Sequence, residues 1–145
     1  MFQYDDLTET DGLYPCVYET IWNVRWGEDG LYLDMLMNQR SSDYEISCAI
    51  NELQYIALQL MVAKVCGFKP GMFTHVIENV QIYDRHVNNV KTLLTRESVR
   101  CCPQLILNTD KTDFYEFTID DFVLTDYPVD KIKEKNPQMK FDLGI

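Results

Sequence analysis

A cysteine follows a proline near the start of the chain, in the run Tyr14-Pro15-Cys16-Val17. A thiol is a good nucleophile only as the thiolate, so covalent chemistry at Cys16 would require a cationic or hydrogen-bonding neighbour. Without such a neighbour, Cys16 would be a small core residue, like most reduced cysteines. The five cysteines show neither Cys-x-x-Cys spacing nor a zinc-type Cys/His pattern, so the sequence predicts reduced thiols and no metal site: Cys16, Cys48, Cys66, Cys101 and Cys102.

A second candidate is the polar run Asn38-Gln39-Arg40-Ser41-Ser42-Asp43. A guanidinium, two hydroxyls and nearby backbone amides together suit the oxygens of a phosphate monoester. The same run would also make an ordinary polar turn in which Arg40 forms a salt bridge with Asp43. The residues alone leave both interpretations open.

Two further groups could contact a nucleoside. The carboxamide of Asn51 offers a donor and an acceptor, which suits the O4/N3 edge of a uracil ring, although Asn is also a common helix cap. In the run Gln81-Ile82-Tyr83-Asp84-Arg85-His86, Tyr83 could donate to a sugar hydroxyl and His86 could transfer a proton. His86 also falls in a helical register in which it would face solvent.

The elements that would position these residues begin with a hairpin. Aromatic and β-branched residues dominate 17–26, residues 31–37 alternate in strand fashion, and the turn Gly27-Glu28-Asp29-Gly30 joins them. From Asn51 to Cys66 the apolar spacing predicts a buried helix, which Gly67 and Pro70 would end. Its apolar positions are Leu53, Ile56, Ala57, Leu60, Met61 and Val65.

The second half of the chain has shorter elements. We expect a strand over 73–83, a helix over 84–95, a strand over 104–107, and a capped turn at 118–121 that leads into a strand over 122–124. The charged tail over 131–140 is loosely specified. Together these elements predict one α+β domain over 1–145, with a mainly antiparallel or mixed sheet packed on a long central helix.

Composition narrows the function. The net charge of −10, from 23 acidic and 13 basic residues, disfavours a nucleic acid polymer as the partner but permits one small phosphorylated ligand. The longest apolar stretch, 56–65, is interrupted by Gln59 and Lys64, and the first residues lack a signal-peptide pattern. We therefore expect no membrane segment and a cytoplasmic location.

In order and spacing, these motifs resemble the carboxyl-terminal half of the thymidylate synthase family, over roughly residues 13–145. Pro15-Cys16 is similar to the family's Pro-Cys-His nucleophile motif, and the run from Gln39 to Asp43 is similar to its Gln-Arg-Ser-x-Asp signature. Asn51 stands where its Leu-Gly-x-Pro-Phe-Asn run ends. Residues 82–87 are similar to its His-Ile-Tyr-x-Asn-His segment. The resemblance implies the fold of that family.

The resemblance also implies reductive methylation of dUMP to dTMP. The Cys16 thiolate would add to C6 of the uracil ring, and C5 would then attack the methylene group of the co-substrate 5,10-methylenetetrahydrofolate. Hydride transfer from the folate would give dTMP and dihydrofolate. Arg40 would act both as a catalytic residue beside the thiolate and, with Ser41, as a phosphate ligand. Asn51 would read uracil, and Tyr83 would bind the ribose 3′-hydroxyl.

By the same resemblance, the substrate-binding residues are Gln39, Arg40, Ser41, Asp43, Asn51, Gln81 and Tyr83. The folate-binding residues are Asp43, Ser47 and Ile145, the last of them in a tail that closes over the ligands.

Several positions depart from the family pattern. Val17 replaces the usual His, 47–50 replace Gly-x-Pro-Phe, and Asn79 and Gln81 replace an Asp and a His that hydrogen-bond the nucleotide and ordered water. These changes keep open a catalytically degenerate nucleotide-binding or interaction module, and a pyrimidine nucleotide hydroxymethylase in which water replaces the hydride step. In the family an N-terminal segment supplies further groups, including a catalytic Glu. We therefore expect a homodimer or a complementing N-terminal segment.

Overall fold

This computed structural model describes residues 14–142. Strands β1 (Val17–Gly27) and β2 (Gly30–Gln39) pair antiparallel and confirm the predicted hairpin. Successive side chains of a strand point to opposite faces, and β2 follows this rule throughout. Its buried positions lie on one face and form much of the core: Leu33, Met35, Met37 and Gln39.

The long helix α1 (Ala49–Cys66) confirms the predicted central helix. The short strand β3 (Ser42–Asp43) and a π-helical turn at Tyr44–Cys48 lead into it. Gly67 ends α1 with a φ of 70°, a left-handed conformation that glycine adopts without steric cost.

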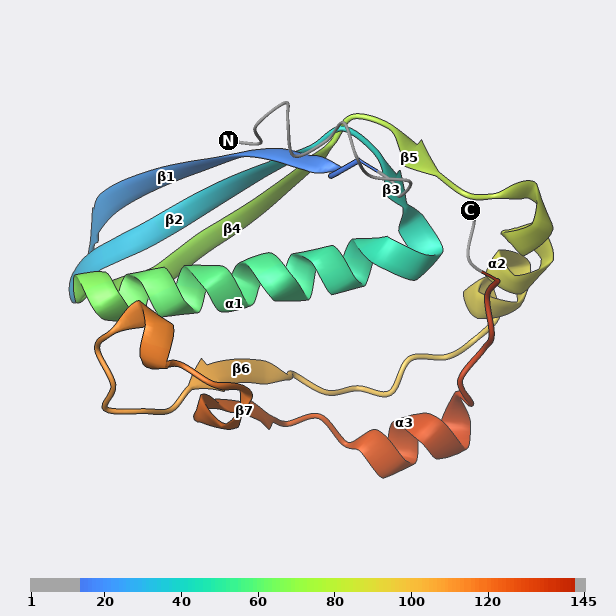
Figure 1. Cartoon of the computed structure of the whole chain (residues 1–145). Coiled ribbons are helices and arrows are strands. Elements are labelled where there is room, and N and C mark those ends of the chain that lie inside the picture. The colour runs from blue at the N-terminus through green and yellow to red at the C-terminus, as the bar shows by residue number, and fades with distance from the viewer. Residues whose placement is uncertain (1–13, 143–145) are drawn as a thin grey trace.

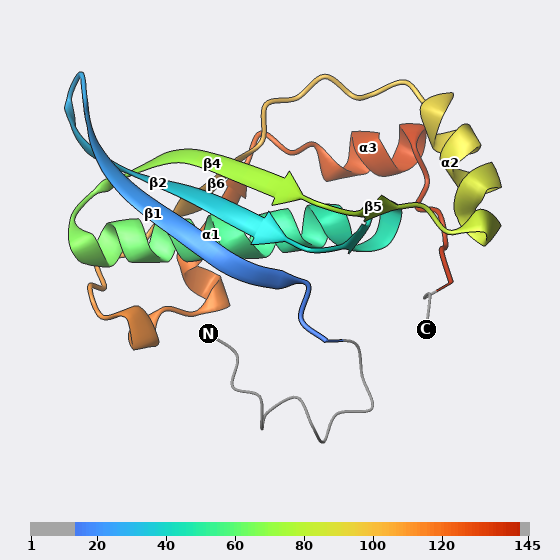
Figure 2. The ribbon, with the colours of Figure 1, turned by 90° about the horizontal axis from the view of Figure 1, so that it is seen from above.

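Strand β4 (Lys69–Ile77) returns beside β2 and pairs with it in parallel, because α1 supplies the crossover connection that a parallel pair requires. The sheet order is β1-β2-β4, and the sheet lies on one side of α1 (Figure 1). The sheet is therefore mixed, which confirms the expected fold class. The strands run diagonally across the helix when viewed from above (Figure 2).

The strand predicted over 73–83 is two strands in the structure. The first, β4, begins earlier than expected, and its second residue, Pro70, is tolerated because β4 lies at the sheet edge. The chain leaves the sheet after Ile77. A second short strand, β5 (Val80–Gln81), then pairs in parallel with β3.

In the rest of the chain, a 3-10 turn at Asp84–His86 leads into α2 (Val87–Leu94). Strands β6 (Gln104–Leu107) and β7 (Phe122–Thr125) pair antiparallel and lie on the side of α1 opposite the sheet (Figure 1). The capped turn predicted at 118–121 is confirmed by a capping box around a 3-10 turn.

The charged tail, which the sequence specified only loosely, begins with a helix that was not predicted. Val129–Lys135 form this helix, α3. Asp130 lies in the first turn, and Lys133 and Lys135 lie in the last turn. These three charges complement the helix dipole, whereas Lys131 and Glu134 lie at the ends where their charges oppose it.

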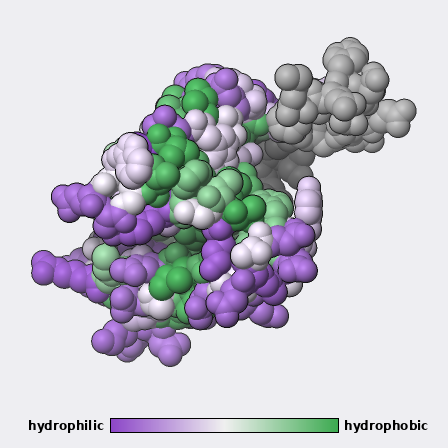
Figure 3. Space-filling model, turned by 90° about the vertical axis from the view of Figure 1, so that its left-hand side faces the viewer, coloured by the Kyte–Doolittle hydropathy of each residue, from purple (hydrophilic) through white to green (hydrophobic). Residues whose placement is uncertain are grey.

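Much apolar surface is uncovered in the described part of the chain. Leu53 and Val65 were expected on the buried face of α1, but both are exposed, because the sheet and β6 cover only part of the helix. Trp26 is 81% exposed at the end of β1. Figure 3 shows apolar atoms between polar patches at the end of the molecule that carries the β1–β2 turn. A helix that is apolar on most sides is normally covered all round.

By length and composition alone, Tyr44–Cys66 is sufficient to cross a membrane, because it has 23 residues and an 18-residue window within it has a mean hydropathy of 1.3. The expectation that no segment meets this criterion was therefore wrong. Core helices of soluble proteins meet it too, and α1 packs on the sheet through a polar side chain. The amide of Gln59 donates to the carbonyls of Leu33 at 2.8 Å and Met72 at 3.2 Å. These contacts hold one face of α1 against the sheet.

Candidate active site

Cys16 and Arg40 meet at the open end of the β1–β2 hairpin. Cys16 immediately precedes β1 and Arg40 immediately follows β2, and the amide of Arg40 donates to the carbonyl of Cys16 at 2.8 Å. The guanidinium donates to the carbonyls of Tyr14, at 2.9 Å, and Pro15, at 3.2 Å. The half-buried Cys16 thiol donates to the same Tyr14 oxygen at 3.8 Å. The thiol and the guanidinium thus donate to the same backbone oxygen.

The alternative interpretation of this run, a turn closed by a salt bridge between Arg40 and Asp43, is wrong for the described residues. None of the ion pairs between residues 14 and 142 joins these two side chains. The Arg40 guanidinium is instead directed toward the segment that carries Cys16.

Gln39 lies at the centre of a polar network behind this pair and is 1% exposed. Its amide nitrogen donates to the carbonyl of Ser41 at 2.8 Å and to Oδ1 of Asn51 at 3.1 Å. Its Oε1 lies 2.9 Å from Nε2 of His75 on β4. Asn51 therefore does not act as a helix cap: it lies inside α1, and its carboxamide is held by Gln39.

A second polar group surrounds the start of α1. Ser42 is buried, and its hydroxyl lies 3.2 Å from the hydroxyl of Ser47, which donates to the carbonyl of Asp43 at 3.0 Å. Gln81 lies beside Asp43 in the β3–β5 pair. Oδ1 of Asp43 is buried and has no hydrogen-bond partner among the described residues. A buried carboxylate oxygen without a donor is costly, so this atom is a candidate acceptor for a ligand.

Tyr83 and His86 lie on the turn that enters α2. The rings of these two residues pack edge to face at 5.8 Å between centroids, and the Arg85 guanidinium lies 5.3 Å from the Tyr83 ring. His86 is 2% exposed, so the interpretation that it faces solvent is wrong. Its Nε2 lies 2.9 Å from the carbonyl of Asp142, which indicates a role in holding the segment that ends at this residue.

The structure therefore brings the sequence-predicted residues together in three neighbouring groups. Cys16 and Arg40 form the first, Gln39 and Asn51 the second, and a third group surrounds the β3–β5 pair. Ser41 joins the first two groups through its carbonyl. Tyr83 lies just beyond β5, and Ile145 lies outside the described residues.

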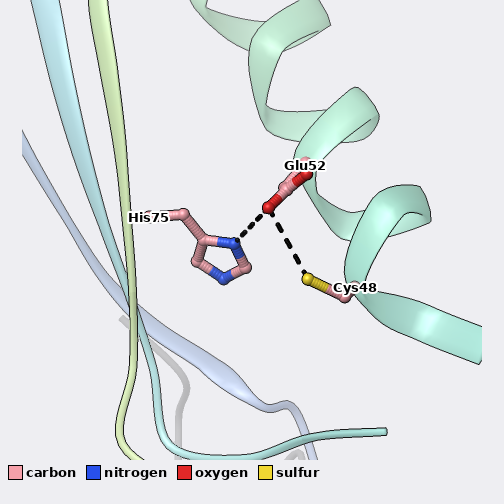
Figure 4. Close-up of side chains that lie close together, drawn as sticks. All are labelled: Cys48, Glu52 and His75. Atoms are coloured by element: carbon pink, nitrogen blue, oxygen red, sulfur yellow. Dashed lines mark hydrogen bonds and ion pairs between the residues drawn. The ribbon is translucent and has the colours of Figure 1, made fainter. Parts of the chain in front are cut away.

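Sequence reasoning missed one cluster, formed by Cys48, Glu52 and His75 (Figure 4). Cys48 and Glu52 lie four residues apart at the start of α1, and Cys48 Sγ lies 3.6 Å from Glu52 Oε1. Nδ1 of His75 lies 3.1 Å from the same Oε1. Burial, reinforced by the Glu52 carboxylate, raises the pKa of the Cys48 thiol. The available signal was the i, i+4 spacing, but the contribution of His75 depends on the parallel pairing of β4.

The fold and the site together define an α+β protein with a cysteine beside an arginine at the mouth of a hairpin, and the comparisons with known proteins agree. The family model for thymidylate synthase matches residues 1–139. The chain belongs to the thymidylate synthase family, a family of methyltransferase-type enzymes.

The chain is 43% identical over 146 residues to a thymidylate synthase of Streptococcus pneumoniae, with 100% of this chain and 50% of the relative covered. A thymidylate synthase of Streptococcus gordonii is 42% identical over the same length and coverage. The solved structure of the thermostable thymidylate synthase A from Bacillus subtilis matches with a TM-score of 0.76 and 36% identity. That match covers 90% of this chain and 43% of the other. The chain thus spans about half the length of the curated relatives it matches.

Proposed function

We propose that this chain, as one domain over 1–145, supplies the carboxyl-terminal half of a site that methylates dUMP to dTMP. The Cys16 thiolate adds to C6 of the uracil ring, and C5 attacks the methylene group of 5,10-methylenetetrahydrofolate. Loss of the C5 proton and hydride transfer from the folate release dTMP, dihydrofolate and the free thiolate. The observation that carries this proposal is the shared Tyr14 oxygen, which places a thiol beside a guanidinium.

The neighbouring groups suit the nucleotide. Arg40 and Ser41 bind the phosphate, and Gln81 and Tyr83 contact the nucleotide from the β5 side. Because Gln39 donates to Oδ1 of Asn51, that oxygen keeps its second lone pair for the N3–H of uracil. The Asn51 amide nitrogen then donates to O4 of the same ring. Cytosine carries no N3–H and a donor at its position 4, so this arrangement favours uracil.

The folate contacts the group around β3. Asp43 offers a buried carboxylate oxygen without a partner among the described residues, which a donor on the pterin would satisfy. Ser47 lies beside it, bonded to the Asp43 carbonyl. We propose Ile145, which lies outside the described residues, as a further folate contact, on the basis of the family resemblance.

The uncovered apolar surface supports a partner. Within residues 14–142, Gln59 and Ala63 are the only buried residues of α1, although the helix is long and apolar. We infer that a complementing N-terminal segment, a second copy in a homodimer, or both cover this surface and supply the remaining catalytic groups. The location that fits this function is cytoplasmic, with neither a nucleic acid polymer nor a membrane as partner.

One observation favours a second candidate, a catalytically degenerate nucleotide-binding module. The Arg40 guanidinium already donates to two backbone carbonyls, so fewer of its N–H groups remain for a phosphate. Val17 in place of the usual His removes a further polar group beside the thiol.

The experiment that separates the two functions is incubation of the full chain with 5-fluoro-dUMP, with and without methylenetetrahydrofolate. The enzyme predicts a covalent adduct at Cys16, detected by intact and peptide mass spectrometry, which is abolished in Cys16→Ser. The matched control, Cys66→Ser, removes an exposed thiol far along the chain and retains the adduct. Reversible dUMP binding without an adduct, also in the presence of a complementing N-terminal segment, supports the binding module. Absence of any nucleotide binding under both conditions rejects both functions.

A further inference from the structure

We propose that Cys48, Glu52 and His75 form a binding site for a transition-metal ion, for which Zn²⁺ is the best match. The thiol comes from the last residue of the π-helical turn and the carboxylate from the first turn of α1, and the imidazole faces them from β4 (Figure 4). Thiolate, imidazole and carboxylate are the three ligand types that zinc prefers in proteins. This site lies outside the residues assigned to the methylation reaction.

Two of the three ligand separations are close to those of tetrahedral coordination. The three ligand atoms lie within 4.8 Å of one another. Two ligands bound to one tetrahedral Zn²⁺ are about 3.3–3.5 Å apart, given metal–ligand bonds of about 2.0–2.3 Å. The observed separations are 3.1 Å between Glu52 Oε1 and His75 Nδ1, and 3.6 Å between Glu52 Oε1 and Cys48 Sγ. The third separation, between Cys48 Sγ and His75 Nδ1, is at most 4.8 Å, so an ion would draw these two atoms together where they lie farther apart than tetrahedral ligands do.

The hydrogen bonds of Gln39 indicate which ring nitrogen of His75 carries the proton and which has a free lone pair. The nitrogen with the lone pair is the one that faces the cluster. Both partners of the Gln39 amide nitrogen are acceptors, namely the Ser41 carbonyl and Asn51 Oδ1. This fixes the carboxamide so that Oε1, which can only accept, faces Nε2 of His75. Nε2 therefore carries a proton, and in the neutral ring Nδ1 has a lone pair directed at a carboxylate oxygen. Either a proton on Nδ1 or a cation between these two atoms satisfies both of them, and a metal ion would replace that proton.

The same contact matches the way proteins orient metal-binding histidines. A ligating imidazole usually donates its second N–H to a carbonyl or carboxylate oxygen, which fixes both the tautomer and the ring orientation. Gln39 Oε1 is the acceptor for the second N–H of His75, and Gln39 is itself buried. The network therefore prepares Nδ1 as a ligand atom.

Burial and charge also suit a cation. Cys48 is 6% exposed and the His75 side chain 7%, so two of the ligand atoms are protected from water. The Glu52 side chain is 42% exposed, which leaves a path for the ion and for a water molecule as the fourth ligand. Among the described residues, the ion pair of Glu52 is with His75 and involves no Lys or Arg. The site can thus supply two negative charges to a divalent ion.

An ion here would join the start of α1 to β4 and, through Gln39, hold the carboxamide of Asn51. Metal binding would therefore position the group proposed to read the base, but the ion itself would not touch the substrate. Because binding of the metal is measured without nucleotide, the result is independent of whether the chain methylates dUMP.

The test uses the full chain, stripped with a chelator and titrated with Co²⁺ and then Zn²⁺. We expect one equivalent of Co²⁺ with tetrahedral d–d bands and a thiolate-to-cobalt charge-transfer band, both displaced by Zn²⁺. Cys48→Ser should lose the charge-transfer band and at least about tenfold in affinity. Glu52→Gln should keep the band but bind about tenfold or more weakly. Circular dichroism of the metal-free variants verifies that they fold.

Cys66→Ser is the matched control, because Cys66 is an exposed thiol at the other end of the same helix. This variant should bind Co²⁺ like the wild type. Failure of the wild type to bind one equivalent would overturn the proposal, since His75 and Glu52 then form an ion pair without a metal. A charge-transfer band that persists in Cys48→Ser would overturn it too, since the metal would then lie on another thiol.

Discussion

The Cys16 thiol and the Arg40 guanidinium donate to the same backbone oxygen, that of Tyr14, at 3.8 and 2.9 Å. Their proximity follows from the register of the hairpin, in which the first residue of β1, Val17, lies opposite the last residue of β2, Gln39. The register shifts between Val17 and Glu19, and irregularities of this kind commonly re-aim side chains near functional sites. The cation beside the thiol is thus positioned by sheet pairing, not by a loop.

Arg40→Lys tests the phosphate-binding role of this pair. Lysine keeps the charge but cannot donate from a planar fork, so it cannot hold the Tyr14–Pro15 segment and a phosphate at once. Hydrogen bonds to charged groups contribute about 1.5–3 kcal/mol, so we expect the Kd for dUMP, measured by calorimetry, to rise about 10- to 100-fold. Arg25→Lys, in an exposed pair with Asp34, is the control and should bind dUMP normally. Equal affinity of the two variants would contradict the role of Arg40.

Gln59→Leu tests the polar contact between α1 and the sheet. Gln59 is buried, and its amide donates to carbonyls of both β2 and β4, so leucine leaves two backbone acceptors without this donor. We expect the free energy of unfolding, from urea denaturation, to fall by about 1–3 kcal/mol. Gln54→Leu places the same change on an exposed position of α1 and should alter the free energy of unfolding by less than about 0.5 kcal/mol. A comparable loss in both variants would mean that the contacts of Gln59 contribute little.

The sequence predicts the elements whose pattern is local. The hairpin, α1 and β6 follow from alternation, helical spacing and turn residues, and α3 was missed because its charges hide a weak pattern. The parallel pairing of β4 with β2 depends on a crossover of about thirty residues, which no local pattern specifies. Both the buried position of His86 and the cluster around His75 depend on such distant contacts, so neither could be predicted from spacing alone.

Acid should destabilise the β6–β7 region through Asp121. Lys111 donates to Asp121 Oδ2 at 2.8 Å, as does the amide of Thr118 at 2.7 Å, and these bonds hold the pKa of Asp121 well below its ordinary value of 3.8. As the pH falls, the Asp121 carboxylate takes up a proton in the unfolded chain before it does so in the folded chain. Its contribution to the free energy of unfolding is therefore fully present above pH 3.8, and it is lost as the pH falls from there through the folded-state pKa.

We therefore expect Asp121→Asn to be less stable than wild type at pH 7 and the difference to narrow below pH 3.8, in urea denaturation followed across pH. Asp120→Asn, at the exposed neighbouring position, should keep the pH dependence of the wild type. If the free energies of unfolding of wild type and Asp121→Asn differ by the same amount from pH 7 to pH 2, the ionised carboxylate does not stabilise the fold.

Residues 140–142 are held on the entrance to α2, and His86→Ala tests this attachment. His86 Nε2 contacts the Asp142 carbonyl at 2.9 Å, and the His86 ring packs edge to face on Phe141 at 5.3 Å between centroids. Asn89 donates to the Lys140 carbonyl at 3.1 Å and assists the attachment. Alanine removes both contacts of His86, which together contribute about 1–3 kcal/mol, so the population of the detached segment should rise about 5- to 100-fold.

Trypsin cleavage after Lys140 measures that population, because a protease cuts a segment in proportion to how often it opens when opening is fast relative to cleavage. The rate in His86→Ala should rise by the same factor, while Asn88→Ala, an exposed neighbour on α2, should be cut like the wild type. Asn89→Ala should show a smaller increase, since it loses one hydrogen bond. Since cleavage elsewhere would report global unfolding, the increase must be confined to the bond after Lys140. Equal rates in His86→Ala and Asn88→Ala would show that His86 does not hold the end of the chain.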